Sequence, residues 1–230
     1  MAPLLLLPGL SSTPELWDAV RAALPVGIVC TALENPALED VDAIAAKILA
    51  AAPPRFALAG FSFGGYVSLA IAAQAGERVE RLALIATGAN ADSTEASASR
   101  KRLIELALSG SYESIDDKMT RFLLHPDHQE DAQIHEKRLR MSREYGAATF
   151  VAQQRAAMAR PSRESTLASI RVPTLIAVGR EDRVTPLAQH EEIARRIPAA
   201  DLVVFEHCGH LVPLEAPVEL AAALTKWMTQ

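Results

Sequence analysis

Ser62 is the residue whose setting points most directly to chemistry. It stands at the centre of Gly60-Phe61-Ser62-Phe63-Gly64, between the apolar run 56–59 and the helix-like run 66–72. So tight a turn between a strand and a helix needs glycine two positions before and after the serine, and it lifts the hydroxyl clear of the sheet edge. The pattern predicts a nucleophilic serine, with a plain helix-starting turn as the alternative interpretation.

A nucleophilic serine needs a base, and the base needs a carboxylate that orients it; two later loops supply candidates. Asp182 lies in the loop 179–186, and His210 lies in the loop 207–210. Each loop follows an apolar, strand-like run, and the carboxyl ends of parallel strands meet at one edge of a sheet. We therefore expect Ser62, His210 and Asp182 to lie close together.

Other side chains compete for these roles. Glu181 and Asp92 are rival acids, and His207 is a rival base. Asp182 could instead simply cap the helix that follows its loop. Cys208 could be a nucleophile, although a buried small side chain is the simpler interpretation of this residue.

The elements that must position these residues alternate between strand and helix. Strands are expected at 4–7, 26–31, 56–59, 79–86, 172–178 and 202–205. Helical periodicity occurs at 13–24, 40–52, 64–74, 187–197 and 213–228. This alternation predicts an α/β fold, a doubly wound, mainly parallel sheet of about six strands with helices on both faces.

The alternation breaks between residues 90 and 166. Four amphipathic helical stretches are expected there, at 97–108, 115–124, 130–145 and 147–160, with no convincing strand. We predict that residues 90–166 form a helical lid, or cap, inserted into a core made of residues 1–89 and 167–230. A lid of this kind would choose the substrate, because it would cover the strand ends.

Three motifs together resemble the α/β-hydrolase superfamily, in particular its small lidded esterases and lactonases. They are Gly-x-Ser-x-Gly at Ser62, Gly-x-x-Asp at Asp182, and Gly-His-Leu-Val-Pro-Leu-Glu-Ala-Pro at His210. Their order along the chain, Ser, Asp, His, is that of the superfamily. The resemblance covers essentially the whole chain and implies that Ser62, Asp182 and His210 form a catalytic triad.

The oxyanion hole of such a site needs two backbone N–H groups, and we expect those of Phe63 and Leu10. Most members of the superfamily carry His-Gly in the loop after the first strand, whereas this chain has Pro8-Gly9. The change leaves the Leu10 N–H available. It also removes a side chain that usually braces the loop.

The resemblance implies hydrolysis of a small to medium carboxylic ester, lactone or thioester through an acyl-enzyme, without a cofactor. An alternative is carbon–carbon chemistry on the same triad, as in 2-succinyl-6-hydroxy-2,4-cyclohexadiene-1-carboxylate synthase and the meta-cleavage-product hydrolases. A further alternative, from another functional class, is a ligand-binding relative that turns over slowly or not at all. An intact triad argues against that last alternative.

A group of histidines suggests metal-ligand spacing at first sight. His125, His128 and His135 are close in the sequence, but Pro126 interrupts them. We expect solvated histidines at helix ends there, and no metal site.

Four cations fall on one expected helix. Lys137, Arg138, Arg140 and Arg143 alternate with acidic residues, which is typical of a solvated helix face. If this face has a function, it would steer an anionic substrate or an acyl carrier toward the site.

Composition narrows the class of protein. The net charge of −5 argues against nucleic acid or an anionic membrane as the main partner. Cys30 and Cys208, the only two cysteines, form neither a disulfide framework nor a metal motif, so a reducing cytoplasm is expected. A small-molecule ester is the expected partner, and the oligomeric state stays open.

Overall fold

Six parallel strands form one sheet in the order β2-β1-β3-β4-β5-β6 in the computed structural model, which describes residues 2–230. The strands are β1 (Leu4–Leu7), β2 (Cys30–Ala32), β3 (Phe56–Phe61), β4 (Val79–Ile85), β5 (Thr174–Gly179) and β6 (Ala200–Phe205). The predicted six-stranded parallel sheet and its α/β class are confirmed.

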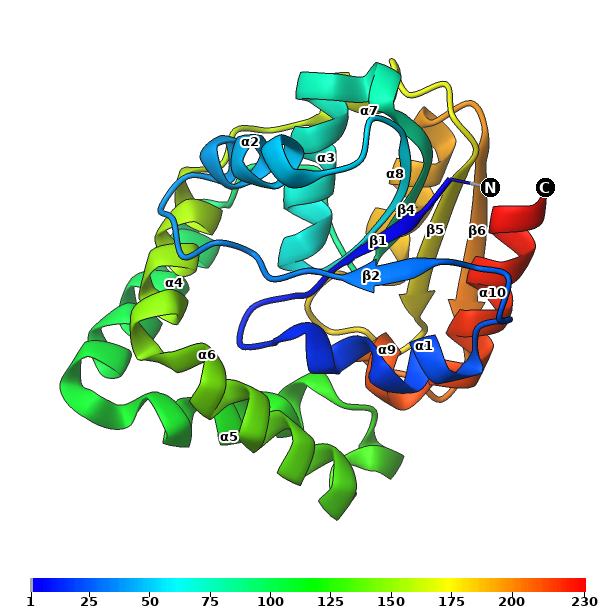
Figure 1. The fold of residues 1–230 in the computed structure, drawn as a ribbon. Helices are drawn as coiled ribbons and strands as arrows, with labels where there is room; N and C mark the ends of the chain where they lie inside the picture. The colour runs from blue at the N-terminus through cyan, green and yellow to red at the C-terminus, as the bar shows by residue number, and fades with distance from the viewer. Residues whose placement is uncertain (1) are drawn as a thin grey trace.

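Strand β1 shows why both faces of the sheet are covered. Leu4 and Leu6 belong to one buried apolar cluster, and Leu5 and Leu7 belong to the other. Successive side chains of a strand point to opposite faces, so an unbroken apolar run is suited to a doubly covered strand. The helices α1 (Asp18–Ala23) and α10 (Pro217–Thr229) cover the first face, and α2 (Val41–Ala51), α3 (Phe63–Ala75) and α8 (Leu187–Arg196) cover the second (Figure 1).

Two elements differ from the sequence-based expectation. The strand expected at 26–31 is β2 instead, an edge strand that begins at Cys30 and leaves Val26 and Val29 exposed. The helix expected at 213–228 is two helices, α9 (Val212–Glu215) and α10. Ala216 separates them with a φ of −135° and a ψ of 51°, since a residue before proline is disfavoured in the helical region.

Residues 90–166, called the insert from here on, connect β4 with β5 through helices and turns. They contain α4 (Thr94–Leu106), α5 (Tyr112–Leu123), the short turn η4 (Pro126–His128), α6 (Ala132–Ala159) and all but the last residue of α7 (Glu164–Leu167). The two helices expected at 130–145 and 147–160 are the two halves of α6, which bends at Gly146 with a φ of 74°. Figure 1 shows α4, α5 and α6 grouped beyond one end of the sheet.

The order of the strands places a crevice beside β1. From β1 the chain moves outward to β2 and then returns to β3 on the other side of β1, so the helices that follow β1 and β2 cover opposite faces. Ligands of doubly wound sheets bind at such a switch point, outside the carboxyl ends of the strands. The loop after β1 and the turn after β3 meet there.

No helix within residues 2–230 has both the length and the apolar character that crossing a membrane requires.

Candidate active site

Ser62 lies on a strained turn between β3 and α3. Its φ of 51° is in the left-handed region, which is uncommon for residues other than glycine. A Cβ atom on Gly60 would lie 2.3 Å from Gly64 O, and one on Gly64 would lie 2.5 Å from Leu7 O. The glycines of the motif are therefore required by close backbone contacts, in agreement with the expectation from the sequence.

Hydrogen bonds connect Ser62 with His210 and Asp182. His210 Nε2 lies 3.0 Å from Ser62 Oγ, and His210 Nδ1 lies 2.8 Å from Asp182 Oδ2. The N–H groups of Val184 and Thr185 donate to Asp182 Oδ1, and the Thr185 hydroxyl donates to Oδ2. These donors fix the carboxylate so that it faces the Nδ1 side of the imidazole, which leaves Nε2 as the proton acceptor toward the serine.

The environment keeps Asp182 ionised. Burial by itself would raise the pKa of this carboxyl group, but the charge of a protonated His210 and the hydrogen bonds from His210 and Thr185 lower the pKa to about 2. Asp182 is therefore a carboxylate at neutral pH. It can stabilise an imidazolium without taking its proton.

Two backbone N–H groups stand at the mouth of the site. Phe63 follows Ser62 at the start of α3, Leu10 lies in the loop after β1, and both residues line the same pocket as Ser62. Within residues 2–230, neither N–H group donates to a protein acceptor. Both are therefore available for a ligand oxygen.

The loop after β1 has a different brace from the usual histidine. Asn35 is buried, and its Nδ2 donates to Pro8 O at 2.7 Å. Gln153 of α6 in turn donates to Asn35 O at 2.8 Å. The side-chain amide of Asn35 thus holds the loop through the backbone carbonyl of Pro8. The proline ring itself has no group that could form a hydrogen bond for this purpose. No sequence signal points to this contact, because Asn35 lies in a loop 27 residues from Pro8 along the chain.

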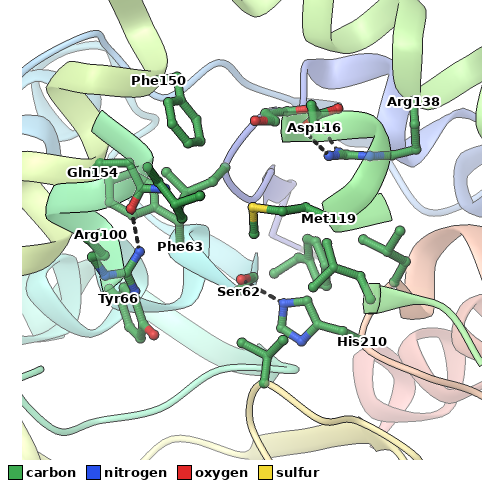
Figure 2. A pocket seen from close by; sticks show the side chains of 17 residues that line it. Ser62, Phe63, Tyr66, Arg100, Asp116, Met119, Arg138, Phe150, Gln154 and His210 are labelled. Atoms are coloured by element: carbon green, nitrogen blue, oxygen red, sulfur yellow. Dashed lines mark hydrogen bonds and ion pairs between the residues drawn. The ribbon is translucent and has the colours of Figure 1, made fainter. Parts of the chain in front are cut away.

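A pocket of about 110 Å³ opens above Ser62 and His210 (Figure 2). Much of its lining is apolar and comes from both the core and the insert. The lining side chains include Leu103, Met119, Leu123 and Phe150 from the insert and Phe61, Phe63, Tyr66 and Val184 from the core. Polar side chains lie at its edges, Arg100 with Gln154 on one side and Arg138 with Asp116 on the other.

A model of the alpha/beta hydrolase family matches residues 4–223. The chain belongs to this family. The match spans nearly all of the chain, so the predicted superfamily is confirmed. The prediction that the protein is a hydrolase is confirmed with it.

Individual relatives agree with this assignment. The chain is 26% identical to a pimeloyl-[acyl-carrier protein] methyl ester esterase from Nitrosomonas europaea, over 95% of this chain and 92% of that protein. It is 32% identical to a 2-hydroxy-6-oxo-2,4-heptadienoate hydrolase from Pseudomonas putida, over 70% of this chain and 59% of that protein. Among solved structures it resembles a malate-bound thermophilic esterase from Thermogutta terrifontis, with a TM-score of 0.89, 26% identity, and coverage of 100% of this chain and 90% of that one.

The rival residues of this α/β hydrolase lie outside the hydrogen-bond chain. Asp92 is buried and pairs with Arg100 and Arg160. Glu181 accepts the Cys208 N–H, and burial raises the pKa of the Cys208 thiol far above its usual range, so the thiolate is disfavoured. His207 is exposed and faces the insert rather than Ser62, at 3.6 Å from an Asp127 oxygen.

The expected basic face is not a continuous charged surface. Arg138 is buried, pairs with Asp116 at 2.9 Å, and donates to Ser11 O at 2.8 Å. Arg140 pairs with Glu15, and Arg143 pairs with Glu113. The interpretation of Arg138 as a solvated side chain is wrong. Its helix lies against the core, so this guanidinium holds the loop that carries Leu10 instead of facing water.

Glu215 supports the loop of His210, and sequence reasoning missed this residue. Its side chain is fully buried, and it accepts the N–H groups of Gly209 at 3.1 Å and Leu211 at 2.9 Å, on either side of His210. It also accepts the N–H of His125 from the insert at 2.7 Å. The available signal was an acidic residue surrounded by apolar ones in Gly-His-Leu-Val-Pro-Leu-Glu, which indicates a buried carboxylate with fixed donors.

His190, on α8, supports the turn that carries Ser62 and was also missed. The Thr87 N–H donates to His190 Nε2 at 3.0 Å, and the Thr87 hydroxyl donates to Ser62 O at 2.7 Å. Burial lowers the pKa of His190 to about 4, so the ring is neutral at pH 7 and Nε2 serves as an acceptor. His190 thus contributes to the position of Ser62 through Thr87.

Proposed function

We propose that this α/β hydrolase cleaves a carboxylic ester of small to medium size through an acyl-enzyme on Ser62. The observation that carries the proposal is the hydrogen-bond chain from Ser62 through His210 to Asp182, which opens into a partly apolar pocket. The esterases among the similar proteins support the same class of reaction. In the proposed roles, Ser62 is the nucleophile, His210 the base, and Asp182 the acid of the triad.

Each step of the proposed reaction uses a group that the site contains. His210 Nε2 takes the proton of Ser62 Oγ as this oxygen attacks the ester carbonyl carbon. The carbonyl oxygen becomes an oxyanion and accepts from the N–H groups of Phe63 and Leu10. The carbon–oxygen bond to the alcohol then breaks, and His210 returns the proton to the leaving oxygen. Water, deprotonated by His210, attacks the acyl-enzyme and releases the acid.

We further propose that the insert acts as a lid that selects the substrate. Leu103, Met119, Leu123 and Phe150 come from the insert and line the pocket that Ser62 enters. A cavity of about 110 Å³ favours short acyl chains over long ones. We also propose a free small molecule as the substrate and the cytoplasm as the location; the cysteine content supports the latter.

A substrate that bears a carboxylate is the second candidate, and Arg100 favours it. Arg100 lines the pocket and donates through Nε to Asp92 and through Nη1 to Gln154. Arg100 and Arg160 share the single carboxylate of Asp92, which leaves this cluster with one excess positive charge. Such a cation suits the acidic substrates of carbon–carbon hydrolases, and the Pseudomonas putida relative is named as one of these.

Covalent labelling together with a series of esters tests the proposal. We expect a fluorophosphonate to label the protein, and p-nitrophenyl acetate and butyrate to be cleaved faster than the octanoate. Ser62→Ala removes both labelling and turnover, whereas Ser169→Ala, at an exposed serine, leaves both unchanged. Turnover that survives in Ser62→Ala would overturn the proposed mechanism.

Two further substrates separate the candidates. Labelling without ester turnover, combined with cleavage of a 2-hydroxy-6-oxo-dienoate, identifies the carbon–carbon reaction. A methyl ester presented free and on an acyl carrier protein measures whether a carrier is used. Labelling without turnover of any of these substrates supports a binding function instead.

A further inference from the structure

The segment of the insert that follows α5 is fastened to the loop that carries His210. The His210 N–H donates to Leu123 O at 2.7 Å, and the His125 N–H donates to the buried carboxylate of Glu215 at 2.7 Å. Glu215 also holds the N–H groups of Gly209 and Leu211. Three segments, the end of α5, the His210 loop and α9, are therefore joined by hydrogen bonds at this junction.

Three side chains with ligand atoms meet on the outside of this junction. His125 and Asp127 come from the insert, and His207 comes from the core loop, three residues before His210. Asp127 Oδ2 lies 3.5 Å from His125 Nδ1 and 3.6 Å from His207 Nδ1. These separations are longer than hydrogen bonds. They are close to the spacing of roughly 3.3–3.5 Å between two ligands on one tetrahedral zinc ion, whose bonds to nitrogen and oxygen are about 2.0–2.1 Å long. All three ligand atoms lie within 4.8 Å of one another, so a small side-chain adjustment brings them onto one ion.

The hydrogen bond to His125 indicates which of its ring nitrogens can bind a metal ion. The Asp127 N–H donates to His125 Nδ1 at 3.1 Å, so Nδ1 carries a lone pair on the side that faces Asp127. His125 Nε2 carries the ring proton and lies 3.9 Å from Glu181 Oε2. A metal-bound histidine commonly directs its second ring nitrogen toward a carboxylate or a carbonyl group, which fixes the ring. A metal ion on Nδ1 has to displace the hydrogen bond from the Asp127 N–H, which lies at the start of the short η4 turn.

We propose that His125, Asp127 and His207 together bind one divalent transition-metal ion of the zinc class. Two imidazole nitrogens and one carboxylate oxygen suit Zn²⁺, Ni²⁺ or Cu²⁺ better than Mg²⁺ or Ca²⁺, which take oxygen ligands. The side chains of His207 and Asp127 are 79% and 67% exposed, so an ion reaches them from solvent and water completes its coordination. The bound ion links the insert to the His210 loop.

This ligand set differs from the one that the sequence suggested. His128 Nδ1 lies 3.1 Å from Glu215 and His135 Nε2 lies 2.7 Å from Gln129 O, so neither belongs to it. The expectation of no metal site rested on the spacing of His125, His128 and His135. It missed His207, which is more than 80 residues from His125 in the sequence and reaches it only through the fold.

Calorimetry with Zn²⁺ on the tag-free, EDTA-treated and desalted protein tests the proposal. We expect one Zn²⁺ per chain, and at least about tenfold weaker binding in His207→Asn. Asparagine is chosen because His207 has a φ of 52°, which asparagine tolerates, and it lacks the imidazole. His135→Asn is the matched control, since His135 also faces an aspartate, and it keeps the wild-type affinity.

Thermal unfolding gives a second, independent measurement. Zn²⁺ at about a hundredfold excess over its Kd raises the Tm of the wild type by roughly 5–10 °C, and it raises the Tm of His207→Asn and of Asp127→Asn far less. Mg²⁺ at the same concentration leaves the Tm unchanged. Unchanged Zn²⁺ affinity in His207→Asn, equal loss in His135→Asn, or an equal effect of Mg²⁺ would overturn the proposed site.

Discussion

The turn that carries Ser62 and the loops that carry Leu10 and His210 are held in different ways. Ser62 is fixed from within the core: its N–H donates to Ile85 O, and its carbonyl accepts from Thr87. The loop of Leu10 is held by Arg138 of the insert, and the His210 N–H donates to Leu123 O of the insert. The proposed nucleophile therefore depends on contacts within the core, whereas the proposed base and the proposed second oxyanion donor also depend on how the insert packs.

The largest effect is expected at the Ser62 turn, which is held within the core. Gly64→Ala places a Cβ atom 2.5 Å from Leu7 O and 2.6 Å from Pro8 O, and backbone on both sides prevents relief. We expect kcat/KM for p-nitrophenyl acetate to fall by about 10²–10³-fold, because Ser62 and the oxyanion donors are displaced together. Gly76→Ala is the control, since a Cβ there meets nothing within 4 Å. Wild-type activity in Gly64→Ala, with an intact circular dichroism spectrum, would contradict the argument from close backbone contacts.

The next effect concerns the loop of Leu10, which Arg138 of the insert holds. Two variants there separate the effect on stability from the effect on activity. Arg138→Met leaves Asp116 buried without its cation, which should lower the free energy of unfolding by about 3 kcal/mol or more. Arg138→Met combined with Asp116→Leu removes both charges, so stability largely recovers. Activity does not recover, because Ser11 O has lost its donor. Urea unfolding and kcat/KM on the same samples measure both quantities.

Arg143→Met is the control for this pair of variants. The ion pair of Arg143 with Glu113 is exposed, and its loss should change stability by less than about 1 kcal/mol. Full recovery of kcat/KM in the double variant would show that the insert does not position the Leu10 loop through Arg138.

The smallest effect is expected in how the free energy of unfolding depends on pH, through His190 beside the Ser62 turn. The pKa of His190 is lowered from 6.5 to about 4 by burial, so below pH 6.5 the unfolded chain binds a proton that the folded chain does not. Stability is therefore lost as the pH falls from 6.5 to 4, by about 2 kcal/mol between pH 7 and pH 5. His190→Gln keeps an acceptor for Thr87 and removes this part of the slope, and His135→Gln keeps it. Parallel slopes for wild type and His190→Gln in urea unfolding would refute the assignment.

Much of the fold was predictable because its signals are local. Apolar runs such as Leu4–Leu7 and the glycines around Ser62 report directly on doubly covered strands and on a tight turn. The boundaries of β2 and the break at Ala216 were missed. An edge strand pairs on one side only, and Ala216 leaves the helix in response to the following proline.

The supporting residues of the site could not be predicted in the same way. Asn35, His190 and Glu215 act through contacts with residues that are distant in the sequence or through backbone atoms. An asparagine in a loop, a histidine on a helix and a glutamate in a short helix are also common at positions with no supporting role. Their residue types alone therefore do not indicate these contacts. Arg138 shows the same limit, because a helical cation among acidic neighbours has the same pattern whether it faces water or a buried carboxylate.

The sequence alone determined the order of the strands and helices, the strained turn at Ser62, and the two strand ends that bear Asp182 and His210. The two-residue period of a strand and the glycines of a tight turn are patterns of neighbouring residues, although the contact that requires Gly64 is with the backbone of Leu7 and Pro8. Only the tertiary structure decided how the insert closes over them. It showed that Arg138 is buried, that Asn35 braces Pro8, and that His207 meets His125 across the junction. Such contacts arise where separate layers pack, and packing depends on the shapes of both partners rather than on a repeat along one of them.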